Sequence, residues 1–179
     1  MTKKFFLNLC FFPLSILSVG FLQLNISKLI SPSAVHATNW NAYNKHVESG
    51  GRNLNNGNYQ KAVDFYNKAL KIYKRDGAIF YNRALSNYEL GNYEEAIEDY
   101  KEALNLENKM RSAITHLNIG NAYKEIEEFE KALFHFDKAI SIKPNEGFYY
   151  QDRGYLYWEL DEWEEALKDF ETAKVLFSV

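Results

Sequence analysis

The sequence predicts an all-α fold, a right-handed α-α superhelix of four helix-turn-helix units. The first observation behind this prediction is a repeat. The aromatic residue that would open the second helix of each unit recurs at intervals of 34, 36 and 34 residues, as Tyr59, Tyr93, Phe129 and Trp163. Four further columns keep these intervals: Gly50, Ala84, Gly120 and Gly154; Ala62, Ala96, Ala132 and Ala166; Tyr66, Tyr100, Phe136 and Phe170; Ala69, Ala103, Ala139 and Ala173. Five columns in phase across four copies indicate a repeat protein.

The second observation is helical periodicity within each copy. In residues 93–106, apolar residues recur at i, i+3, i+4, i+7, i+10 and i+11 from Tyr93, which places them on one face of a helix. Charged residues occupy the opposite face, and Leu90-Gly91-Asn92 forms a tight turn before it. A hairpin this small cannot bury its apolar side alone, so neighbouring units must stack on it and form a superhelix with a concave face.

The N-terminal segment, residues 1–37, has the pattern of an export signal. It carries three lysines and no acidic residue, and a strongly apolar run occupies residues 5–24. Val35 and Ala37 stand at the −3 and −1 positions of a signal-peptidase site, so we expect cleavage before Thr38. The alternative is a membrane anchor at residues 5–24, because this run approaches the ~20 residues that span a bilayer.

Either interpretation places the repeats outside the cytoplasm, in a periplasm, a thylakoid lumen or the extracellular space. Residues 38–179 are then predicted to form the repeat domain. Thr38–Ala42 is expected to be a short polar lead-in, with Trp40 as a brace over the first helix. The four units are predicted at about residues 43–76, 77–112, 113–146 and 147–179.

Local signals mark the ends of several helices. Asn55-Asn56-Gly57-Asn58 predicts a turn in the first unit, and Pro144 follows the expected end of a helix at Ile142. The pair Gly50-Gly51 costs about 1 kcal/mol per residue relative to alanine, so the first helix should be the least rigid. Lys174 stands in a column that is apolar in the other three units. A polar residue there suits a terminal unit whose outer face meets water.

These columns resemble those of the tetratricopeptide repeat over about residues 43–179. The third unit matches its 34-residue pattern best, with Gly120, Tyr123, Ala132, Phe136, Ala139 and Pro144. The first two units depart at position 11, where Asn53 and Asn87 replace an aromatic residue. Leu54 and Tyr88, one place further on, can compensate. The resemblance implies the fold and says little about the ligand.

We find no catalytic, cofactor-binding or metal-binding pattern, and we expect a non-enzyme without a cofactor. The four histidines share no metal-ligand spacing, and the single cysteine, Cys10, lies in the apolar N-terminal run. Acidic pairs such as Glu94-Glu95 lie early in helices, where they complement the helix dipole. Residues 38–179 hold 18 Lys and Arg against 24 Asp and Glu, a charge of −6, which argues against nucleic-acid binding.

The resemblance implies a concave groove lined by the first helices. Its candidate residues are Tyr81, Asn82, Leu85, Tyr88, Leu117, Asn118, Asn121, Lys124, Gln151, Tyr155 and Trp158. A carboxylate clamp, as in chaperone-binding relatives, needs lysine, arginine and asparagine at set positions of three successive units. This chain has the asparagines but not the lysines or the arginine. The rings and amides instead suit an extended or helical apolar segment of a protein, although Tyr81 and Trp158 could equally serve packing between helices.

The sequence therefore predicts a non-catalytic scaffold that binds a protein or peptide outside the cytoplasm, for example during assembly of an envelope or membrane complex. Two alternatives remain open. One is a structural protein that self-associates into a homo-oligomer through an uncovered end near Leu176 and Phe177. The other is an accessory subunit of a larger enzyme. Contact with a membrane is expected only through the N-terminal segment, if that segment is retained.

The exported protein should begin at Thr38. Intact-mass analysis of the mature protein would show a chain without residues 1–37. A mass that includes Met1, together with extraction only by detergent, would contradict cleavage and favour the anchor.

Overall fold

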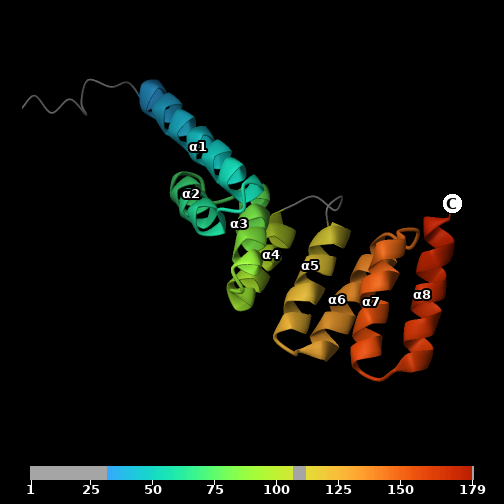
Figure 1. Cartoon of the computed structure of the whole chain (residues 1–179). Helices are drawn as coiled ribbons and strands as arrows, with labels where there is room; N and C mark the ends of the chain where they lie inside the picture. The colour runs from blue at the N-terminus through green and yellow to red at the C-terminus, as the bar shows by residue number, and fades with distance from the viewer. Residues whose placement is uncertain (1–31, 107–111, 179) are drawn as a thin grey trace, which may run out of the picture.

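The computed structural model describes residues 32–106 and 112–178, which contain eight α-helices and no strand (Figure 1). The helices are α1 (Pro32–Asn55), α2 (Tyr59–Ile72), α3 (Gly77–Glu89), α4 (Tyr93–Leu106), α5 (Ser112–Glu125), α6 (Phe129–Ile142), α7 (Gly147–Glu159) and α8 (Trp163–Phe177). Consecutive helices pair into four hairpins, and each hairpin packs on the next. The all-α superhelix of four helix-turn-helix units is thereby confirmed.

The first helix is longer than the sequence suggested. The predicted lead-in, Thr38–Ala42, is helical and lies inside α1, so the first helix begins before the predicted start of the first unit near residue 43. The chain has neither glycine nor a second proline between Pro32 and Ser49, so nothing in it stops the helix. Trp40 stacks on Tyr43 at 5.0 Å and approaches Tyr73, which follows α2, at 6.4 Å between ring centroids. Trp40 thus braces the first hairpin.

The anchor expected at residues 5–24 lies outside the described residues, as does most of the predicted signal. Among the helices that the structure describes, none has both the length and the apolar character required to cross a bilayer.

The turn inside each hairpin places one residue in the left-handed region. Gly57 and Gly91 adopt φ values of 73° and 78° in the first two hairpins, as the turn predictions require. Glu127 and Asp161 adopt φ values of 59° and 60° at the same places in the last two. A side chain costs roughly 1–2 kcal/mol in this conformation, so packing of the hairpin imposes the turn there.

The small-residue column lies where the two helices of a hairpin cross. A Cβ atom on Gly120 would lie 2.5 Å from Cε1 of Phe136 and 3.2 Å from the carbonyl oxygen of Ala132. A Cβ atom on Gly50 would lie 2.4 Å from the ring of Tyr66. In both cases the ring belongs to the same hairpin.

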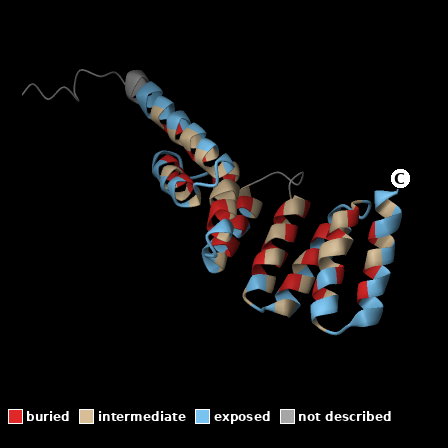
Figure 2. Ribbon diagram, viewed as in Figure 1, coloured by how far each residue is buried: buried red, intermediate tan, exposed pale blue. Residues whose placement is uncertain are grey.

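The buried side chains line the inner faces of the hairpins and fall into two clusters (Figure 2). The larger cluster runs through α3 to α7 and includes Tyr100, Phe136 and Tyr149. The smaller one joins α1 and α2 to the start of α3 through Tyr66 and Ile79. The hydrophobic core thus divides between the first hairpin and the rest of the superhelix.

Gly120→Leu should lower the free energy of unfolding by about 2–4 kcal/mol, because a bulky side chain must displace Phe136 at the helix crossing. Gly51→Ala is the control: its new Cβ would meet nothing closer than the Tyr66 hydroxyl at 3.9 Å. That control should be neutral or should stabilise by up to about 1 kcal/mol through helix propensity. Urea denaturation of both variants measures the difference, and an unchanged midpoint for Gly120→Leu would show that the column does not lie at a tight crossing.

Candidate functional site

A cavity of about 150 Å³ lies between α3 and α5, the first helices of the second and third units, with Tyr100 of α4 in its lining. It is lined by Leu85, Tyr88, Glu89, Tyr100, Asn118 and Asn121. Leu85, Tyr88, Asn118 and Asn121 are predicted groove residues, and the structure brings them together. Glu89 also stands at one of the first-helix positions that line the groove in the repeat pattern. The repeat pattern did not predict Tyr100 as a groove residue, because Tyr100 belongs to the aromatic column of the second helices, which is expected to pack in the core.

Amide side chains link successive units along this surface. Asn118 Nδ2 donates a hydrogen bond to the Tyr81 hydroxyl at 3.0 Å, and Asn121 Nδ2 donates to Asp152 Oδ2 at 3.3 Å. Lys124 lies 3.8 Å from a carboxylate oxygen of Glu159. The predicted amides therefore hold neighbouring units together as well as facing the groove.

Two aromatic side chains on α7 remain open to solvent. Tyr155 is 51% exposed and Trp158 is 57% exposed. Each has an edge-on ring contact with α8, to Phe170 at 5.2 Å and to Trp163 at 4.7 Å. The structure thus fixes the orientation of both rings and leaves about half of each side chain without contacts.

The remaining predicted residues differ in accessibility. Asn82 and Gln151 are partly buried on α3 and α7. Leu117 is only 5% exposed and packs in the larger core cluster. A partner cannot contact a side chain buried to this extent, so Leu117 belongs to the core, and we leave it out of the proposed surface.

Acidic groups surround the concave cavity. Burial, followed by the nearby carboxylate of Glu125, raises the pKa of Tyr88 to about 12, so its hydroxyl stays protonated and can donate a hydrogen bond. Burial also raises the pKa of Asp152, although the hydrogen bond from Asn121 opposes this shift. The structure places its carboxylate beside the groove amides.

On the other side of the hairpins, an arginine joins two of the units to the preceding one. Arg83 Nε and Nη2 donate to the Asp99 carboxylate at 2.7 and 2.6 Å. Arg153 makes the corresponding pair of bonds to Asp169 at 2.7 and 2.8 Å, and it also pairs with Asp137 of the preceding hairpin. The hydrogen bond to Asp169, first among several causes, raises the pKa of Arg153.

In the third unit the positions of Arg83 and Asp99 are taken by Ile119 and His135, and His135 contacts His116 of the same hairpin. His116 and His135 lie with their Nδ1 atoms 2.9 Å apart, and Lys101 Nζ donates to the Tyr123 hydroxyl at 2.7 Å. Burial, then the neighbouring His116 and Lys101, lowers the pKa of His135 to about 4, and burial also lowers the pKa of His116. Within residues 32–106 and 112–178, no group of three or more His, Cys, Asp or Glu side chains could hold a metal ion.

This pair should make the fold less stable in mild acid. Both imidazoles resist protonation in the folded chain, so below the ordinary pKa of 6.5 the unfolded chain binds more protons and the free energy of unfolding falls. Urea denaturation at pH 7 and pH 5 should show this loss, and it should shrink in His116→Gln/His135→Gln. His46→Gln, in the first hairpin, is the control. An equal loss in the double variant would assign the effect to other groups.

The comparisons with known proteins agree with this geometry. Two family models, both described as tetratricopeptide repeat, match residues 53–76 and 75–145, about half of the chain together. A stretch of 62 residues is 34% identical to stress-induced-phosphoprotein 1 of Caenorhabditis elegans. It covers 35% of this chain and 19% of that protein, so the chain spans about a fifth of the length of this relative.

Solved structures show the same fold. MamA from Desulfovibrio magneticus RS-1, residues 41 to the end, superposes with a TM-score of 0.72 at 23% identity, covering 76% of each chain. The tetratricopeptide repeat domain of Arabidopsis OM64 superposes with a TM-score of 0.62 at 23% identity, covering 68% of this chain and 98% of that domain. At these identities the similarity supports the fold alone. Together with the matched family models and the four stacked hairpins, it shows that the chain belongs to the tetratricopeptide repeat family.

Proposed function

We propose that this protein is a non-catalytic interaction module that holds a segment of a partner protein in the concave groove of α3, α5 and α7. Domains of this family are protein-interaction modules and are generally non-catalytic. The observation that carries the groove proposal is the exposed pair Tyr155 and Trp158, on the same series of first helices as the cavity around Tyr88. Large rings that are held in place yet half exposed supply contact area at low entropic cost.

The groove chemistry favours an apolar segment without strong negative charge. Glu89, Glu125 and Glu159 are exposed along its rim, so an acidic segment or a chain-terminal carboxylate would be repelled. A neutral or basic segment would avoid this penalty. The amides of Asn118 and Asn121 can hold its backbone if they exchange some of the hydrogen bonds that they make between units.

The proposed location is outside the cytoplasm, and the N-terminal sequence pattern supports it. The basic start, the apolar run and the small residues at positions 35 and 37 are typical of exported proteins. A module of this kind in a periplasm, a thylakoid lumen or the extracellular space would serve the assembly of an envelope or membrane complex.

Tyr88→Ala/Trp158→Ala should abolish retention of the partner, because truncating a buried aromatic anchor costs about 2 kcal/mol or more of binding. The partner is first identified by co-purification from extracytoplasmic extract. Its affinity for the wild-type and variant chains is then measured by titration calorimetry. Amidating the C-terminus of the partner should change the affinity little, and added salt should weaken the complex only modestly.

Phe134→Ala is the matched control, because Phe134 is 55% exposed and lies on α6, outside the groove. It should bind like the wild type, and all variants should keep wild-type helicity. Affinity that survives both groove truncations would exclude the groove as the site.

Self-association is the competing function, and one observation favours it. The end of α8 carries exposed Val175 and Phe177, and Phe177 lines a cavity of about 390 Å³ together with Phe170 and Ala173. If the groove variants bind normally, this face becomes the better candidate. Sedimentation of the purified chain over a range of concentrations separates the two functions.

A further inference from the structure

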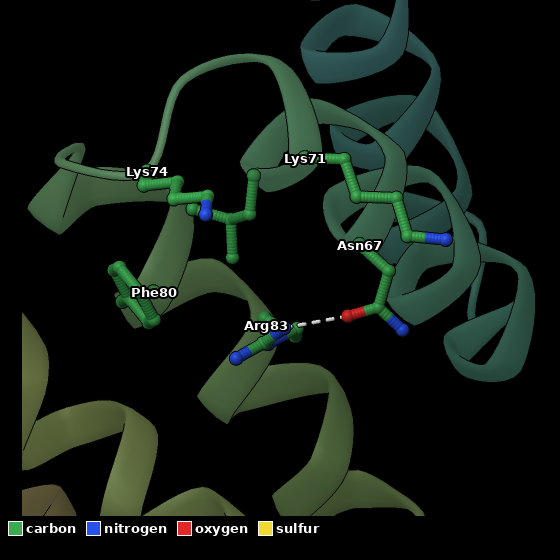
Figure 3. A pocket seen from close by; sticks show the side chains of 6 residues that line it. Asn67, Lys71, Lys74, Phe80 and Arg83 are labelled. Atoms are coloured by element: carbon green, nitrogen blue, oxygen red, sulfur yellow. Dashed lines mark hydrogen bonds between the residues drawn. The ribbon is translucent and has the colours of Figure 1, made fainter.

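A second cavity, of about 410 Å³, opens between α2 and α3 (Figure 3). It is lined by Asn67, Leu70, Lys71, Lys74, Phe80 and Arg83. It lies beside the smaller core cluster, in which Leu70 of α2 packs with Ile79 and Phe80 of α3. None of these residues belongs to the concave groove, and the two sites share no side chain.

The rim of this cavity is basic. Lys71 and Lys74 are exposed, and neither makes an ion pair within the part of the chain that the structure describes. None of the six lining residues is acidic. Residues 61–75 as a whole hold five Lys and Arg against one Asp, whereas residues 38–179 carry a net charge of −6. The positive charge is therefore concentrated on α2 and the residues that follow it, whereas the adjoining cavity that shares Asn67 and Arg83 is lined by Glu95, Glu98 and Asp99.

The floor of the cavity is apolar and fixed. Leu70 is only 7% exposed, and Phe80 is partly buried. The guanidinium carbon of Arg83 lies 5.4 Å from the centroid of the Phe80 ring. Arg83 is held by Asp99 and by Asn67, whose side-chain oxygen accepts a hydrogen bond from Nη1. A cation fixed beside an apolar floor can interact with a charged group and a hydrophobic group of one ligand.

The same chain contains an equivalent junction without these features. Seventy residues further on, between α6 and α7, Asp137 replaces Asn67, Ser141 replaces Lys71 and Pro144 replaces Lys74. The apolar and arginine positions are kept as Ile140, Tyr150 and Arg153. There Arg153 is paired with two carboxylates, those of Asp137 and Asp169. Packing of one unit on the next therefore does not require a basic rim.

We propose that the cavity between α2 and α3 binds an acidic segment of a protein partner in which an apolar side chain lies between Asp or Glu residues. The apolar side chain would contact Leu70 and Phe80, and the carboxylates would pair with Lys71 and Lys74. Bidentate binding of a phosphate is disfavoured, because Asp99 already occupies the planar fork of Arg83. The concave groove has an acidic rim, so the two sites select segments of opposite charge.

The test uses the full chain and a labelled peptide, N-acetyl-EEFEE-amide, measured by fluorescence anisotropy at low ionic strength. The wild-type chain should bind one equivalent. Lys71→Glu/Lys74→Glu should weaken binding by at least about tenfold, because it reverses two rim charges. Lys138→Glu/Lys143→Glu, which makes the same charge change on exposed positions of the third unit, should alter the affinity by less than about twofold.

Two further arms test the chemistry of the ligand. Replacing the phenylalanine of the peptide by glycine should weaken binding, because the apolar floor loses its contact, and inorganic phosphate should not compete. Asp137→Asn/Ser141→Lys/Pro144→Lys transfers the basic rim to the junction between α6 and α7. It should add a second equivalent of bound peptide. Tyr88→Ala/Trp158→Ala should leave peptide binding unchanged, which separates this site from the proposed groove.

Several results would overturn the proposal. An equal loss in both lysine variants would indicate nonspecific attraction to total charge, and absence of binding to the wild type would exclude the site. A concentration-dependent increase in mass of the wild-type chain that Lys71→Glu/Lys74→Glu abolishes would show that a second copy occupies the cavity instead.

Discussion

The close crossing of the two helices in each hairpin is the constraint on which the other packing depends. At this crossing the first helix has a glycine or alanine, and the second helix places a ring directly against it, as Phe136 does against Gly120. A larger residue would separate the helices and lift the ring out of the core. The short distance between the two helices of a hairpin also sets where the first helix presents its groove residues. The exposed rings of α7 depend on it too, since α8 supports them from behind.

The contacts between hairpins are less uniform than those within them. Arg83 donates to Asn67 and Arg153 pairs with Asp137 of the preceding hairpin, whereas the third hairpin is joined to its predecessor by the hydrogen bond from Lys101 to the Tyr123 hydroxyl. Charged hydrogen bonds of this kind are directional, so they fix the rotation of one unit on the next. Within the third hairpin, His116 and His135 contact each other, and both imidazoles resist protonation. Acid should therefore weaken the packing of this hairpin first.

Charge divides the molecule into two chemically different surfaces. The concave groove combines half-exposed rings with an acidic rim, and the junction of α2 and α3 combines an apolar floor with lysines. A single ligand could not satisfy both, because a segment attracted by one rim is repelled by the other. If both proposals hold, the protein can hold two segments at once, which would bring two partners, or two parts of one partner, together on a rigid support.

Much of the fold could be predicted from spacing alone. Five columns in phase specify which residues meet inside a hairpin, because a 34-residue repeat fixes both helix faces and the turn between them. The turns at Gly57 and Gly91 followed from glycine. The left-handed conformations of Glu127 and Asp161 did not, since positive φ is uncommon for residues other than glycine. The repeat columns also do not show that α1 extends back through Thr38–Ala42, because this stretch precedes the first repeated position.

The sequence by itself determined the repeat, the helical hairpins and the family, because these depend on periodicity along the chain. It also predicted which first-helix positions line the groove, and the structure brings four of these residues, Leu85, Tyr88, Asn118 and Asn121, around one cavity. Tertiary structure alone decided which predicted side chains are accessible, burying Leu117 and leaving Trp158 exposed. It also decided that Arg83, Lys71 and Lys74 surround a cavity with an apolar floor. Such a site joins residues from two hairpins, and the rotation between hairpins is set by packing and not by any pattern within one repeat.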